Sequence, residues 1–161
     1  RAQMVSAANR IANIFLDEKL VIRRSPQVEH ERKVAIYDLL VENEFTLLEG
    51  ELGPYNLHLS VEDNRLVFSV CDEDDDEIAR LTLPSSVFRK IIKDYFLICE
   101  NYFEAIKIRT PSQIEAIDMA RRGIHDEGAE LLRVHLSSAV AMDRNTARRL
   151  FTLMCILHIR A

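Results

Sequence analysis

The chain contains 161 residues, of which 48% are hydrophobic and 29% are charged, with only four glycines and four prolines. This composition argues against a disordered chain, and the scarcity of turn-forming residues argues against a many-turned β-sandwich. A chain of this length buries about 68–70% of its unfolded surface, so we expect residues 1–161 to form a single domain.

The net charge of −5 is unevenly distributed along the chain. Residues 1–104 carry 12 Lys or Arg and 20 Asp or Glu, whereas residues 105–161 carry 9 and 6. A basic end on an acidic body favours an anionic small molecule or an acidic protein partner over duplex nucleic acid. Basic runs interleaved with aromatic residues, which single-strand binders use, are absent as well.

The cysteine content indicates a reducing compartment. Cys71, Cys99 and Cys155 are odd in number and widely spaced, as is typical of reduced and mostly buried thiols. No apolar run approaches the roughly 18 residues of a membrane span, and the first residues lack the apolar core of a signal peptide. We therefore expect a cytoplasmic protein with no membrane partner.

The first half of the chain is expected to hold the strands and one helix. Ser25 is a good N-cap and Pro26 suits the first helical position, so they predict a helix over 26–43. Strict alternation of apolar and polar residues over 55–62, followed by Asp63-Asn64, predicts a β-hairpin. A short strand is expected over 11–16. The strands expected over 45–48, 55–62, 65–72 and 77–83 are combined into a small antiparallel meander of about four strands.

Helical periodicity replaces the alternation after Pro84. Apolar residues recur every three or four positions and predict a helix over 86–108 that covers one face of the sheet. Pro111 opens a second helix, which Gly123 or Gly128 could bend or interrupt, and Asp143 caps the last helix. Strands followed by helices predict an α+β fold, with the meander packed against a C-terminal set of three to four helices. The sheet region would span 11–84 and the helical region 85–161.

The acidic loop after residue 71 imitates a calcium-binding loop only at its start. Asp72, Asp74 and Asp76 match the first ligand positions of such a loop. The loop would also need Gly at its sixth position and Glu at its twelfth, and Glu77 and Leu83 stand there instead. A solvated hairpin tip is therefore the interpretation that we prefer.

The segment His125-Asp126-Glu127 contains the H-x-E pattern of zinc deaminases, but the accompanying P-C-x-x-C is missing. If the last two helices form an antiparallel hairpin about residue 140, His125 falls opposite Cys155, and His158 follows one turn later. These three residues form a weak alternative metal site, because zinc accepts both thiolate and imidazole. The competing interpretation is that they are ordinary core residues.

The same hairpin brings charged residues together. Glu130 would meet Arg148 or Arg149, so that the acidic side chains of one helix neutralise the basic side chains of the other. Arg121 and Arg122 are harder to explain, since neighbouring side chains point about 100° apart on a helix and a single acid rarely pairs with both. The guanidinium groups could instead bind an anion beside His125, or simply complement the helix dipole.

Three long segments, KDYFLICENYFEAI, QIEAIDMARRGIHDEG and DRNTARRLFTLMCILH, resemble uncharacterised protein family 0262, small proteins found mainly in alphaproteobacteria. The shorter segments VEHERKVAIYDLL, GPYNLHL and RLVFSV are similar to that family too. The resemblance covers nearly the whole chain from about residue 11 and implies a bacterial cytoplasmic protein. It implies no activity, cofactor or catalytic residue.

The first functional hypothesis is a regulatory or interaction protein that binds an anionic small molecule or an acidic surface. Its ligand-binding residues would be Arg121, Arg122, His125, Glu127, Arg148 and Arg149. The alternative is a hydrolase or transferase in which His125 and Glu127 form an acid–base pair, with or without a metal. No nucleophile elbow, phosphate loop or dinucleotide fingerprint is present, so we predict no cofactor and favour the non-enzymatic hypothesis. A homodimer through apolar helix faces is a further expectation.

Overall fold

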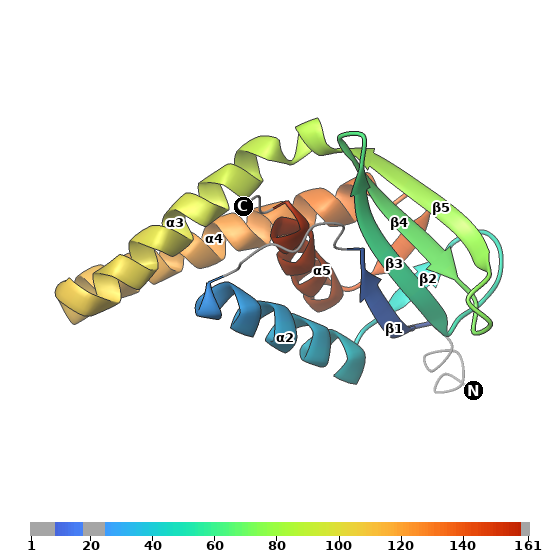
Figure 1. Ribbon diagram of the computed structural model, residues 1–161, viewed down its shortest axis with the longest axis horizontal. Coiled ribbons are helices and arrows are strands. Elements are labelled where there is room, and N and C mark those ends of the chain that lie inside the picture. Colours follow the sequence, from blue (N-terminus) through green and yellow to red (C-terminus); the bar gives the residue numbers. More distant parts are fainter. Residues whose placement is uncertain (1–8, 18–24, 159–161) are drawn as a thin grey trace.

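The computed structural model describes residues 9–17 and 25–158 (Figure 1). It confirms the α+β fold, with strands concentrated in the first half of the chain and long helices in the second. In chain order the elements are β1 (Ile11–Leu16), α2 (Pro26–Val41), β2 (Phe45–Leu47), β3 (Tyr55–Glu62), β4 (Arg65–Cys71), β5 (Glu77–Pro84), the 3₁₀ turn η1 (Ser85–Val87), α3 (Arg89–Ile108), α4 (Pro111–His135), β6 (Val140–Met142) and α5 (Arg144–Leu157).

The main sheet has the strand order β1-β3-β4-β5. Strands β3, β4 and β5 form the predicted antiparallel meander, but β1 joins its edge parallel to β3, so the sheet is mixed. Strand β2 does not belong to this sheet. It pairs with β6 in a separate two-stranded ribbon. The two strands are far apart in the sequence and only three residues long, so their sequences do not reveal the pairing.

The hairpin between β3 and β4 follows the expected chemistry. Asp63 and Asn64 adopt φ values of 52° and 60°, which these two residue types tolerate better than most. The pairing register puts apolar residues of both strands on the face that meets the helices, and mostly polar ones, with Val67 as an exception, on the outer face.

Helix α4 runs without interruption through both of its glycines, so the break considered from sequence does not occur. The two glycines have different surroundings. A Cβ at Gly123 would have no atom within 4 Å, whereas a Cβ at Gly128 would lie 2.2 Å from Cζ of Phe151. Gly128 therefore allows the close approach of α4 and α5, and Phe151 fills the space where a side chain would have been.

The helices are arranged around α5, which lies against β3, while α2 contacts β1. Helix α3 leads away from the sheet and lies alongside α4 (Figure 1). Residues Ile92, Tyr95 and Cys99 of α3 still join the common hydrophobic core. The expectation that α3 covers the sheet is thus only partly met, because the amphipathic α5 takes the central place.

Candidate functional site

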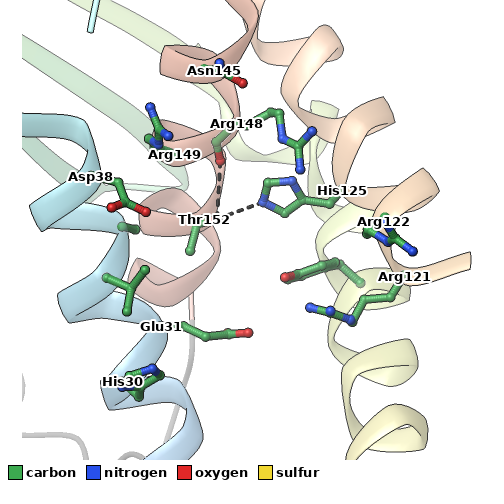
Figure 2. A pocket seen from close by; sticks show the side chains of 13 residues that line it. His30, Glu31, Asp38, Arg121, Arg122, His125, Asn145, Arg148, Arg149 and Thr152 are labelled. Atoms are coloured by element: carbon green, nitrogen blue, oxygen red, sulfur yellow. Dashed lines mark hydrogen bonds between the residues drawn. The ribbon is translucent and has the colours of Figure 1, made fainter. Parts of the chain in front are cut away.

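A cleft with a volume of about 540 Å³ opens between α2, α4 and α5 (Figure 2). Its polar lining comes from three separate parts of the chain and Tyr95 of α3 adds an aromatic wall. The polar residues are His30, Glu31 and Asp38 of α2, Arg121, Arg122 and His125 of α4, and Asn145, Arg148, Arg149 and Thr152 of α5. Four arginines thus face two carboxylates.

Arg121 and Arg122 share one acid. Asp118 Oδ1 lies 2.5 Å from Arg121 Nη2, and its Oδ2 lies 3.1 Å from Arg122 Nη2. A single acid was expected to pair with both only rarely, and Asp118 does so because it lies three and four residues before them on the same helix. Arg121 also stacks on the ring of Tyr102, 4.6 Å from its centre. One carboxylate shared by two guanidinium groups leaves positive charge at this wall of the cleft.

The charged contact between α4 and α5 uses another acid than expected, one turn earlier on α4. Arg148 Nη1 lies 3.0 Å from Asp126 Oδ1 without hydrogen-bond alignment, and that oxygen has no hydrogen-bond partner in the described part of the chain. Glu130 pairs with Arg133 of its own helix and not with Arg148 or Arg149. The two helices do pack as neighbours, but Asp126 takes the place foreseen for Glu130.

His125 is held in one orientation at the base of the cleft. Its Nε2 lies 2.7 Å from Thr152 Oγ1, and the Thr152 hydroxyl donates to the Arg148 carbonyl at 3.2 Å. Since the hydroxyl has a single proton, His125 Nε2 must be the donor to Thr152. Burial and then the Arg148 guanidinium lower the pKa of His125 to about 4, so the imidazole is neutral at pH 7.

Sequence reasoning missed all the cleft residues of α2, and Glu31 is the one among them that faces an arginine. Its side chain reaches from α2 toward Arg121 (Figure 2). Burial raises the pKa of the Glu31 carboxyl, and the Arg121 guanidinium opposes this effect only in part. Glu31, Ala35 and Asp38 follow one another at helical spacing, so polar residues on the inward face of α2 were the available signal.

Three other predicted residues, Glu127, Cys155 and His158, do not line the cleft. Glu127 is exposed and does not line the cleft, because two residues along a helix turn the side chain by about 200° from His125. Cys155 is buried in the core, while His158 contacts the Met154 carbonyl and Ser85 Oγ. Within residues 9–17 and 25–158, the ligand atoms of His125, Cys155 and His158 do not converge as a metal site requires.

None of the helices in the described part of the chain combines the length and apolarity that a bilayer crossing requires.

Comparison with known proteins identifies the family. The model of the Uncharacterised protein family (UPF0262) matches residues 8–160, and the chain belongs to this family. A UPF0262 protein of Paramagnetospirillum magneticum is 56% identical over 151 residues, which is 94% of this chain and 96% of the relative. A UPF0262 protein of Agrobacterium fabrum is 52% identical over 157 residues, 98% of this chain and 99% of the relative. No solved structure matches the chain.

Proposed function

We propose that this protein binds an anionic small molecule in the cleft between α2, α4 and α5, and that it acts as a regulatory or interaction protein. The observation that carries the proposal is the convergence of four arginine side chains from two helices on one concave space. Guanidinium groups bind phosphate and carboxylate oxygens in a planar, two-pronged geometry. A phosphorylated or multiply carboxylated compound therefore fits this lining best.

The size of the cleft favours a small molecule over a flat acidic protein surface. Ligand pockets commonly have volumes of about 300–1,000 Å³, and this cleft has about 540 Å³. Asn145 and Thr152 add polar groups beside the arginines. Neutral His125 leaves the positive charge to the guanidinium groups and positions Thr152 through their hydrogen bond.

Titration of the protein with pyrophosphate, followed by NMR or calorimetry, tests the proposal. We expect saturable binding that Arg122→Gln and Arg149→Gln each weaken about tenfold or more, because a hydrogen bond to a charged group contributes about 1.5–3 kcal/mol. Arg122 is suited to this test because its side chain is 58% exposed, so its loss leaves the fold intact.

Arg133 provides the matched control. It pairs with an acid three residues earlier, as Arg121 does, but it lies outside the cleft. Arg133→Gln should leave pyrophosphate binding unchanged. Absence of saturable binding, or an equal loss of affinity in all three variants, would show that the arginines form no specific site.

A further inference from the structure

A second cluster of functional groups lies on the outer face of the sheet, away from the face that packs on the helices. Alternation along β3 and β4 sends His58, Ser69 and Cys71 to this side. They line a hollow of about 530 Å³ together with Asp75 and Glu77. None of these residues lines the cleft between α2, α4 and α5, the arginine cleft.

The acidic loop that imitates a calcium site in sequence has a different role in the structure. Asp72 Oδ1 accepts hydrogen bonds from the backbone N–H groups of Asp74 and Asp76, both at 3.0 Å. Asp75 adopts a φ of 64° within this turn. The turn directs the Asp75 carboxylate back over the sheet, where its Oδ1 lies 2.8 Å from His58 Nε2.

Cys71 completes the cluster at the end of β4. The register of β4 with β5 shifts between Val70 and Cys71, an irregularity of the kind that redirects side chains at the edges of sheets. One ring nitrogen of His58, the Sγ of Cys71 and one carboxylate oxygen of Asp75 all lie within 4.8 Å of one another. Within residues 9–17 and 25–158, no other set of three such groups comes this close.

The surroundings of Cys71 favour a cation. Burial raises the pKa of the Cys71 thiol, and the nearby carboxylates of Asp75, Glu77 and Asp72 raise it further. The thiol therefore stays protonated on its own and is not an activated nucleophile. A bound divalent cation would lower the pKa of this thiol, because its positive charge stabilises the thiolate. The three carboxylates in turn attract the cation.

We propose that His58, Cys71 and Asp75 bind a zinc-type divalent cation, with the remaining coordination position open to the hollow. Sulfur, imidazole nitrogen and carboxylate oxygen together are a ligand set of zinc and unlike the all-oxygen sets of calcium and magnesium. Zinc bonds of about 2.0–2.3 Å need ligand atoms about 3.3–3.8 Å apart, so atoms that now lie within 4.8 Å of one another have to move by about 1 Å on binding. Binding replaces the thiol proton of Cys71 by the metal and releases that proton to solvent.

Cobalt(II) titration of the full chain tests this site without any assumption about activity. We expect one cobalt ion per chain, a thiolate-to-cobalt charge-transfer absorption, and displacement of the cobalt by added zinc. Cys71→Ser should abolish the absorption. His58→Gln and Asp75→Asn should each weaken binding more than about tenfold, since even residues that only orient metal ligands contribute 10–100-fold.

Asp74→Asn and His30→Gln are the matched controls, because Asp74 neighbours the site without lining the hollow and His30 lies in the arginine cleft. Both should bind cobalt as the unaltered protein does. In the described part of the chain, Cys99 and Cys155 belong to no group of three His, Cys, Asp or Glu ligand atoms, so we expect no competing site at these thiols. Lack of a charge-transfer band, or a band that survives in Cys71→Ser protein with an unchanged circular dichroism spectrum, would overturn the proposal.

Discussion

Replacement of Gly128 by alanine tests the central packing contact of the molecule. The added Cβ would lie 2.2, 2.5 and 2.6 Å from three ring atoms of Phe151, whereas carbon atoms normally approach to about 3.5–4.0 Å. The ring would have to withdraw by more than about 1 Å, yet it is fully buried and contacts Tyr95 and His125. Overpacking of this kind costs about 1–3 kcal/mol, and the helix propensity of alanine offsets about 1 kcal/mol of it.

Gly123→Ala isolates the helix-propensity effect, since nothing lies within 4 Å of that position. It should stabilise the protein by up to about 1 kcal/mol, so the two variants should differ by about 1–3 kcal/mol in urea unfolding. For a domain of this size each kcal/mol changes the melting temperature by about 2–4 °C. A Gly128→Ala protein as stable as Gly123→Ala would refute the packing that we describe. Adding Phe151→Leu to Gly128→Ala should recover part of the loss if the clash is its cause.

Three further predictions concern stability and pH. The pKa of His125 is about 4 in the folded protein and about 6.5 in the unfolded chain, so the unfolded chain binds the proton first as pH falls through this window. The free energy of unfolding should decrease by up to about 3 kcal/mol between about pH 6.5 and pH 4, and urea unfolding of His125→Asn should show a flatter pH dependence; an unaltered slope would contradict this. The raised pKa of Glu31 implies that sulfate, whose charge is constant in this range, binds more tightly as pH falls and Glu31 loses its charge. Calorimetry should find tighter and less pH-dependent sulfate binding by Glu31→Gln, and equal affinity at neutral pH would argue against a role of Glu31. Asn43→Ala should lower the free energy of unfolding by about 1–3 kcal/mol, because its side chain satisfies the N–H and C=O of Ile11 and the C=O of Leu39; a loss below about 0.5 kcal/mol in urea unfolding would count against this contact.

Part of the first candidate site was predicted from the sequence. Arg121, Arg122, Arg148 and Arg149 were predicted as one patch from an assumed helix hairpin, and the structure places all four in the lining of one cleft. Their binding role stays a prediction. The assumed antiparallel register is close to that of the packed helices, since Gly128 of α4 lies against Phe151 of α5. The expected acid partner of Arg148 was wrong by one turn, because Asp126 and not Glu130 lies next to its guanidinium group.

The groups that sequence reasoning did not connect are brought together by a turn or by the packing of separate elements. Asp75 reaches His58 only because the 72–76 turn folds back over the sheet. Glu31 enters the arginine cleft only because α2 packs on α5. Helical spacing shows which face of α2 holds Glu31, but it does not show which segment that face meets, and the partner of Asp75 has no periodic signal at all. Each contact depends on where two separate segments are packed.

The sequence alone determined the α+β class, the β3–β4 hairpin, most helix boundaries and the family, because periodicity, capping residues and turn residues act over a few neighbouring positions. Tertiary structure decided the parallel β1, the β2–β6 ribbon, the register of α4 with α5 and the composition of both clefts. These features depend on the fit between faces of separate elements. At Gly128 that fit is set by a single missing Cβ and the Phe151 ring that occupies its place.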